Sequence, residues 1–285
     1  MTYGALCPLV LGAFFLVVPA QSGPISFTTG APDGRLGAAS RPGTTTEIES
    51  ADDFILSNQS LITSATFTGL LPTSAPLSSI TRVGVEFYRV FPLDSVNPPD
   101  GRVPTRVNSP SDNAFSSFDV TLGNMTFTAS VLNPNFAVAN SVLNGINPIP
   151  NQTTGGEGAV TGEEVSFSVT FSPGAMLPGD HYFFKPQVAL SSGNFYWLST
   201  ARSAPLFPGD LQAWIRNTNL APDWLRIGTD IVGGTSPPTY NMAFSLQGTD
   251  TPEPGTLAMM FAGAIAVATL RLRGRRSTKC ARRLL

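Results

Sequence analysis

The chain has 285 residues, enough for one large or two small domains, and its only cysteines are Cys7 and Cys280. The formal net charge of −2 conceals two opposite blocks: residues 21–251 hold 10 basic and 18 acidic side chains, a net of −8, and the last 15 residues hold seven cations and no acid. An acidic body argues against nucleic acid or anionic lipid as its partner. Without cysteine, residues 21–251 have no disulfide, thiolate metal site or cysteine nucleophile.

The first 20 residues have the pattern of a secretory signal peptide. Leu9–Val18 is an apolar run, and Val18-Pro19-Ala20 places a small residue at the cleavage position. We therefore expect the mature chain to begin near Gln21. The basic residues that usually open such a signal are missing from Met1–Tyr3.

Short segments of the body alternate apolar and polar residues, which is the pattern of half-buried strands. The clearest is Val165–Phe171, where every odd position is apolar and every even position carries a hydroxyl. In chain order, strands are expected at 25–29, 52–56, 61–69, 83–89, 165–171 and 242–246, with shorter ones at 211–216 and 224–227. The turn residues of Gly30–Gly34 predict a surface loop over 30–46, and a second long loop is expected over 92–110.

Two hairpins are expected where strand-like segments are separated by turn residues. The first joins 115–122 to 125–132 across Gly123-Asn124, and the second joins 182–190 to 194–198 across Ser191–Gly193. The body offers no helical stripe of any length. The expected fold class is therefore all-β, an antiparallel, jelly-roll-like β-sandwich, with a linker at 247–251.

The last 34 residues differ in character from the body. Thr256–Leu270 is free of charge, and as a helix its 15 residues would measure about 22 Å. Cations directly after an apolar run stay in the cytoplasm and leave the upstream chain on the far side. Leu257–Leu270 is thus expected to be a single transmembrane helix, with a buried helix of a globular domain as the alternative. The topology anchors would be Arg271, Arg273, Arg275 and Arg276.

The order of these parts carries a resemblance. Pro252-Glu253-Pro254, the apolar run and the basic end resemble the PEP-CTERM sorting signal of bacterial exported proteins. The resemblance implies processing by an exosortase, a membrane enzyme that cuts near the motif, with Pro252, Glu253 and Pro254 as recognition residues. The two prolines also keep this segment extended. The expected organisation is a signal peptide at 1–20, a β-sandwich ectodomain at 21–251 and a sorting tail at 252–285.

Candidate catalytic side chains are few. His181 is the only histidine, which argues against a Ser-His-Asp triad and a multi-histidine zinc site, and we expect it to be exposed. Two carboxylates across a cleft would suffice for a glycoside hydrolase. The adjacent pairs Asp52-Asp53 and Glu163-Glu164 would point to opposite faces of a strand. Further single candidates are Glu86, Asp119 and Asp223. We expect no enzyme and no cofactor.

Two binding sites are considered. Exposed aromatic rings could form a sugar-stacking platform, although core packing is expected for at least two of them; the candidates are Tyr196, Trp197, Trp214 and Trp224. Calcium could bind oxygen ligands in and around one loop, with solvated loop acids as the alternative; the candidates are Asp94, Asn97 and Asp100, with Asp112 nearby. The spacing does not match an EF-hand, so no metal is assigned.

These observations predict an exported protein, anchored in the inner membrane by its C-terminal helix until an exosortase processes it. It would then reach the cell surface or the extracellular matrix as a structural or adhesive component. A carbohydrate-binding module with an extracellular polysaccharide as partner is the first alternative, and a two-carboxylate hydrolase is the weaker one. The stretches 52–69 and 210–234 resemble the ectodomains of other PEP-CTERM proteins, which implies no particular activity.

Overall fold

The computed structural model describes residues 23–43, 46–147, 149–201, 205–251, 263–265 and 268. The chain divides into two units, Gly23–Thr251 and the combination of Met1–Ser22 with Pro252–Leu285. The expected signal peptide, the Pro252-Glu253-Pro254 motif and the anchor arginines lie outside the described residues. Residues 263–265 and 268 are helical, and the remainder of the expected span Leu257–Leu270 also lies outside. Within the described ranges, no helix is long and apolar enough to cross a membrane.

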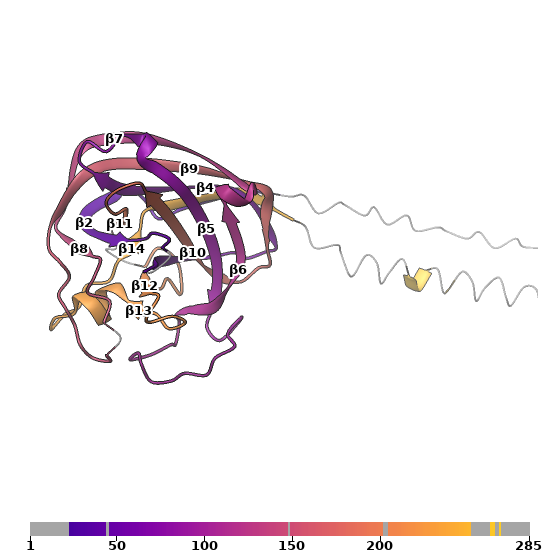
Figure 1. The fold of residues 1–285 in the computed structure, drawn as a ribbon. Coiled ribbons are helices and arrows are strands. Elements are labelled where there is room, and N and C mark those ends of the chain that lie inside the picture. Colours follow the sequence, from indigo (N-terminus) through magenta and orange to yellow (C-terminus); the bar gives the residue numbers. More distant parts are fainter. Residues whose placement is uncertain are drawn as a thin grey trace, which may run out of the picture. The chain divides into compact units, whose positions relative to one another are not determined.

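The unit Gly23–Thr251 consists of two open β-sheets packed face to face, which confirms the expected all-β sandwich (Figure 1). The larger sheet contains β1 (Pro24–Thr28), β15 (Phe244–Asp250), β4 (Ser60–Pro72), β11 (Tyr196–Thr200), β2 (Pro32–Ala39), β8 (Asn140–Val142), β14 (Asn241–Met242), β9 (Val160–Leu177) and β7 (Met125–Val138). The smaller sheet runs in the order β13 (Leu225–Arg226), β12 (Trp214–Asn217), β3 (Ile48–Ile55), β10 (His181–Leu190), β5 (Ile80–Val90) and β6 (Pro110–Asp119).

The pairing is antiparallel except between β2 and β8, which run parallel and make the larger sheet mixed. Two short 3-10 turns, η1 (Leu77–Ser79) and η2 (Val120–Leu122), and one π turn, η3 (Ile227–Val232), interrupt the strands. In the part of the chain that the structure describes between 23 and 251, no α-helix occurs.

The core lies between the sheets and is largely aromatic. On β9 the side chains of Val165, Phe167, Val169 and Phe171 are buried, while Ser168 and Thr170 are exposed, as the alternation predicts. Phe167 stacks on Phe67 of β4 with 4.9 Å between ring centroids and 1° between planes. Across the sandwich, Phe171 meets Phe118 of β6 at 4.5 Å. Alternate residues of both sheets thus form one core without any disulfide.

The expected surface loop over 30–46 is wrong in its middle, because residues 32–39 form β2. This strand pairs with β11 on one side and β8 on the other, and Leu36, Ala38 and Ala39 are fully buried. Small residues are needed here because neighbours approach closely: a Cβ on Gly37 would lie 3.1 Å from Cβ of Tyr196. The segment 32–39 is rich in glycine, alanine and other residues of low β-propensity, so its composition indicates a turn rather than a strand between two others.

Both expected hairpins are also wrong. β6 pairs with β5 and β7 pairs with β9, so the turn at Gly123 carries the chain from one sheet to the other. In the same way β10 pairs with β3 and β5, whereas β11 pairs with β2, β4 and β14. Figure 1 shows β7, β9 and β4 in one layer and β5, β10 and β6 in the other. A short polar turn can connect two strands of different sheets as well as the two strands of a hairpin.

The expected linker over 247–251 is also wrong for most of its length. Residues 247–250 are the end of β15, whose last residue is Asp250.

Candidate functional site

The three candidate tryptophans do not form a surface platform. Trp197, Trp214 and Trp224 are all buried, and a buried ring offers no face to a sugar. Trp197 donates its indole N–H to the carbonyl of Ala243 at 2.9 Å. Trp224 packs under the guanidinium of Arg216, 4.2 Å from its ring centroid. Of the four aromatic candidates, only Tyr196 stays partly exposed.

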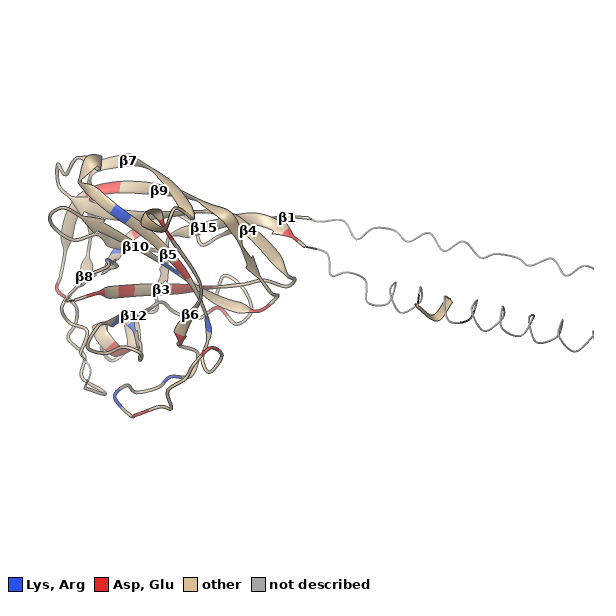
Figure 2. Ribbon diagram, turned by 45° about the vertical axis from the view of Figure 1, so that its right-hand side comes forward, with Lys and Arg blue, Asp and Glu red and all other residues tan. Residues whose placement is uncertain are grey.

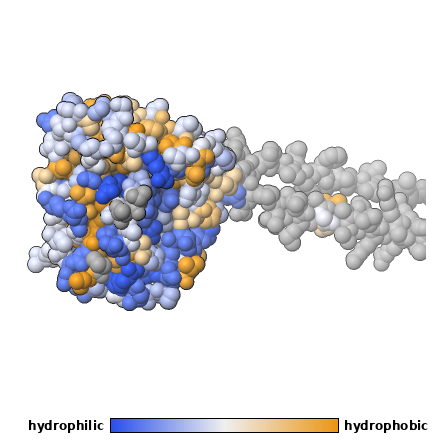
Figure 3. Space-filling view, in the orientation of Figure 1, coloured by the Kyte–Doolittle hydropathy of each residue, from blue (hydrophilic) through white to orange (hydrophobic). Residues whose placement is uncertain are grey.

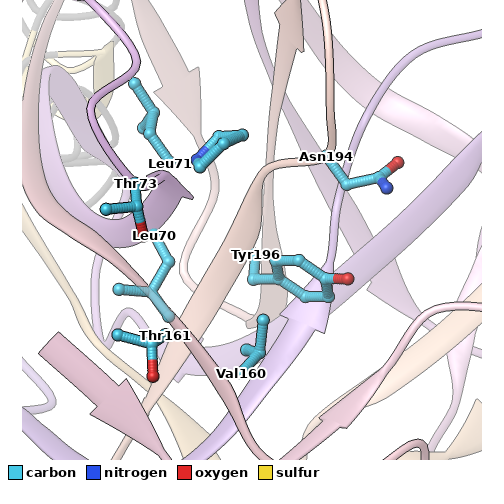
Figure 4. Close-up of a pocket in the computed structure, with 8 residues that line it drawn as sticks. Leu70, Leu71, Thr73, Val160, Thr161, Asn194 and Tyr196 are labelled. Atoms are coloured by element: carbon cyan, nitrogen blue, oxygen red, sulfur yellow. The ribbon is translucent and has the colours of Figure 1, made fainter.

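Tyr196 lines a pocket of about 230 Å³ on the outer face of the larger sheet (Figure 4). The register brings its strand beside Leu70 of β4, which in turn pairs with Glu164 of β9. Figure 4 shows the Tyr196 ring between Asn194 and Val160, with its hydroxyl pointing away from Leu70. The other lining residues are Leu71, Pro72, Thr73 and Thr161. Burial raises the pKa of Tyr196, so its hydroxyl is a neutral hydrogen-bond donor at neutral pH.

A second hollow of about 390 Å³ adjoins the Tyr196 pocket and shares Pro72 and Thr73 with it. Its lining is rich in hydroxyls, from Ser74, Ser78, Ser79, Ser191 and Ser192. Gly193 lines this second hollow with a backbone φ of +83°, and a Cβ there would lie 2.5 Å from Cγ of Pro72. Together the two hollows offer one aromatic ring, one amide and several hydroxyls, with no charged lining residue.

A buried charged cluster lies on the outer face of the smaller sheet. Figure 2 shows acidic and basic positions on neighbouring strands of this sheet, among them β3, β5 and β10. Lys185 Nζ lies 3.0 Å from Oε1 of Glu49 and 2.8 Å from Oε2 of Glu86. Arg216 pairs with the second oxygen of Glu49 and donates to the Tyr88 hydroxyl at 3.0 Å. Two acids therefore face two cations, and their charges balance.

This cluster is built as an ion network and is poorly suited to acid–base catalysis. Burial acts to raise the pKa of Glu49, but Lys185 and Arg216 outweigh it and lower the pKa to about 2. A carboxyl with such a pKa is no proton donor near neutral pH. Lys185 also occupies the space between the two carboxylates that a hydrolase needs for its substrate. Sequence reasoning missed this network, although Lys185, the only lysine of residues 21–251, interrupts the apolar segment Tyr182–Leu190.

Asp52 and Asp53 point to opposite faces of β3, as their adjacency predicts. Asp52 accepts a hydrogen bond from the backbone N–H of Met242 at 2.7 Å. Asp53 lies 2.6 Å from Nε2 of His181 and also accepts from the N–H of Leu211. His181 was expected to be exposed, but its side chain retains only 22% of its accessible surface. Burial raises the pKa of both aspartates.

Two other candidate carboxylates, Asp119 and Asp223, form ion pairs with arginines. Asp119 lies 2.7 Å from Arg82, and Asp223 lies 2.9 Å from Arg106. Glu163 and Glu164 lie on β9, where burial raises the pKa of Glu164. Lys185 bridges Glu86 and Glu49, and so does the Tyr88 hydroxyl, which lies 2.7 Å from Oε2 of Glu86 and 3.3 Å from Oε1 of Glu49.

Two of the calcium candidates, Asp94 and Asp100, are also ion-paired with arginines. Asp94 lies 3.3 Å from Arg89, and Asp100 lies 2.6 Å from Arg102. Asn97 contributes its backbone N–H to Asp112 at 3.0 Å. Over the described ranges, no group of three or more His, Cys, Asp or Glu side chains is arranged to hold a metal. The loop acids thus have local partners, and the geometry gives the calcium hypothesis no support.

Comparison with known proteins bears on the tail. Residues 250–276 match the family described as the PEP-CTERM protein-sorting motif, a stretch that contains Pro252, Glu253, Pro254 and the arginines at 271, 273, 275 and 276. No curated protein sequence matches the chain. This match implies an exported envelope or surface protein that is processed at its C-terminal end. More particularly, the match identifies a PEP-CTERM protein, a substrate of an exosortase.

Proposed function

We propose that this protein is a non-catalytic structural or adhesive component of the cell surface or extracellular matrix. The proposal rests on one combination: the sorting motif at residues 250–276 follows a body in which the candidate carboxylates Glu86, Asp119 and Asp223 are ion-paired. Glu49, Glu86, Asp119 and Asp223 each face a lysine or an arginine. In these ion pairs the four carboxylates are held by cations, which leaves them poorly placed to act as the acid and base of a hydrolase.

The sorting half of the proposal assigns recognition to Pro252, Glu253 and Pro254, and topology to the four arginines. We expect Glu253→Ala to leave the body folded while the precursor accumulates in the membrane fraction. Immunoblots of membrane and surface fractions measure this, and Gln247→Ala, which changes an exposed side chain of β15 upstream of the matched stretch, is the control. Surface release of Glu253→Ala at the normal level would contradict the assignment.

A second candidate function is carbohydrate binding at the Tyr196 pocket. The favouring observation is its lining: a partly exposed ring for the apolar face of a sugar, the Asn194 amide, and uncharged hydroxyls for the sugar hydroxyls (Figure 4). The absence of charge from this lining matches a neutral polysaccharide better than an acidic one.

The test is polysaccharide pull-down with the unit Gly23–Thr251 and its variants Tyr196→Ala and Asn194→Ala. Asn135→Ala, an exposed amide on β7, is the matched control. Binding that is lost in both pocket variants and kept in the control supports the candidate. Binding that survives both changes, or no binding to any polysaccharide, removes it. For the hydrolase alternative, turnover of a glycan that disappears in Glu86→Gln would contradict the non-catalytic role.

A further inference from the structure

The strand β7 has a free edge. It pairs with β9 on one side, and in the part of the chain that the structure describes no strand pairs with its other side along Met125–Leu132. Only beyond β7 does the chain find a partner on that side: Ala139 donates its N–H to the carbonyl of Gly34, and β8 pairs with β2. Register shifts near Asn133 and the ring of Pro134 end the regular stretch. Seven consecutive residues, Met125–Val131, therefore present an unpaired, extended edge.

The other edges of the described sheets are protected, and this one is not. β1 has five residues and begins with Pro24, β8 has three residues, and β13 has two. β6 carries Pro110, Asp112 and Asp119, and its pairing with β5 is irregular in two places. Short length, proline, charge and bulges are the devices that keep sheet edges from joining. Along Met125–Val131 none of them is present.

The hydrogen-bond pattern tells which backbone groups point outward. Ser172 donates its N–H to the carbonyl of Asn124 at 2.9 Å, in the same register as the β7–β9 pairing. In an antiparallel strand the backbone N–H and C=O groups of successive residues point alternately to the two sides. From residue 124 onward, the groups of the even-numbered residues therefore bond to β9. The N–H and C=O groups of Met125, Phe127, Ala129 and Val131 then face the free edge.

The charge distribution favours another copy of this chain as the partner for the edge. The body is acidic, so most contacts between two copies would bring like charges together. Between Asp119 and Glu157, however, the sequence contains no charged residue. In Figure 3 the rim where Figure 1 places β7 has mostly pale, intermediate hydropathy. Val131 and Leu132 are 42% and 56% exposed, so pairing would also cover apolar surface.

We propose that the free edge of β7 pairs antiparallel with the same edge of a second copy, about a two-fold axis at Thr128. This register uses all of the outward backbone groups, because it places Met125 opposite Val131 of the copy and Phe127 opposite Ala129. The pairing joins the larger sheets of two bodies into one continuous sheet. The surface is distinct from the Tyr196 pocket, and the inference does not depend on carbohydrate binding.

Cysteine cross-linking tests the register, because the unit Gly23–Thr251 contains no cysteine of its own and carries a complete core. In this register Thr128 lies opposite Thr128 of the copy in a non-hydrogen-bonded residue pair. The Cβ atoms of such a pair lie about 4.5 Å apart, close to the Cβ–Cβ spacing in a disulfide. Thr128→Cys should therefore form a covalent dimer under mild oxidation. Ser168→Cys, opposite Thr128 on the neighbouring strand β9, is the matched control and should remain monomeric. A mixture of Thr126→Cys and Ser130→Cys should yield heterodimers.

Charge substitution gives an independent measurement in solution. Light scattering after size exclusion should show a concentration-dependent dimer of the unaltered unit. Thr128→Lys or Thr128→Glu alone should raise the dimer dissociation constant by about fivefold or more, because like charges would lie opposite each other across the axis. An equimolar mixture of the two variants should restore the dimer, and Ser168→Lys should have no effect. A monomer at every concentration, or equal cross-linking of Thr128→Cys and Ser168→Cys, would overturn the proposal.

Discussion

The ammonium of Lys185 lies 3.0 Å from Oε1 of Glu49, and both side chains are buried on the outer face of the smaller sheet. Each would be costly to bury without the other. We expect Lys185→Met to lower the free energy of unfolding by about 3–5 kcal/mol, because Glu49 and Glu86 would lose their shared cation. Urea unfolding measures the change. Arg82→Met, which removes a largely exposed partner of Asp119, is the control and should cost less than about 1 kcal/mol.

The low pKa of Glu49 predicts a dependence on pH. The pKa falls from an ordinary value of 4.5 to about 2 in the folded state. A lowered carboxyl pKa contributes stability above the unfolded value, and that contribution is lost as the pH falls from 4.5 toward about 2. The difference in unfolding free energy between the unaltered protein and Glu49→Gln should therefore be large near neutral pH and shrink below pH 4.5. A difference that is constant across this range would contradict the assignment.

Asp52 should show the opposite sign. Burial and the neighbouring Asp53 raise its pKa above the ordinary 3.8, so its ionised form opposes folding once the pH exceeds that value. Asp52→Asn cannot ionise, and its amide oxygen can still accept from the N–H of Met242. We expect this variant to be more stable than the unaltered protein at neutral pH and to lose that advantage below pH 3.8. Thermal unfolding of both proteins at neutral pH and below pH 3.8 measures this difference. Lower stability of Asp52→Asn at neutral pH would contradict the prediction.

Gly193 and Gly101 provide a matched pair of backbone positions. Both have a φ of +83°, but a Cβ on Gly193 would lie 2.5 Å from Cγ of Pro72, whereas Gly101 has open space around it. Gly101→Ala should cost about 1 kcal/mol for the left-handed backbone alone. Gly193→Ala should cost more, because Pro72 must also move, and the Tyr196 pocket should change shape with it. Equal losses of unfolding free energy would show that the contact with Pro72 carries no cost.

The all-β class could be predicted from the sequence because each sheet buries only one face. Val165–Phe171 alternates as it does because its apolar residues enter the core and its hydroxyls remain outside. β2 could not be predicted in this way, because its crowded position between two strands selects Gly37 and Ala38 over β-branched residues. The hairpins failed for a different reason. The residues around Gly123 encode a turn, and the partners of β6 and β7 are fixed by contacts far away in the sequence.

The candidate sites show the same limit. The sorting tail was recognisable because its three parts are contiguous in the sequence, and the match to residues 250–276 agrees. Tyr196 could be listed as an aromatic candidate, but Leu70, Val160 and Asn194 join it only through strand register. The tryptophans were open to either interpretation, since an indole ring suits a core as well as a sugar surface. Their burial in the structure favours the core.

The pairing of β15 limits where an exosortase can cut without damage. Asp250 donates its N–H to the carbonyl of Gly23, and Thr251 donates to that of Gln59, so ladder contacts persist up to the residue before Pro252. Cleavage upstream of this point would remove part of β15, the strand that pairs with β1 on one side and with β4 on the other. Scission after Thr251 would leave the released body intact. Cleavage at or after the Thr251–Pro252 bond therefore preserves the whole of β15, whereas cleavage within Phe244–Asp250 removes part of a paired strand.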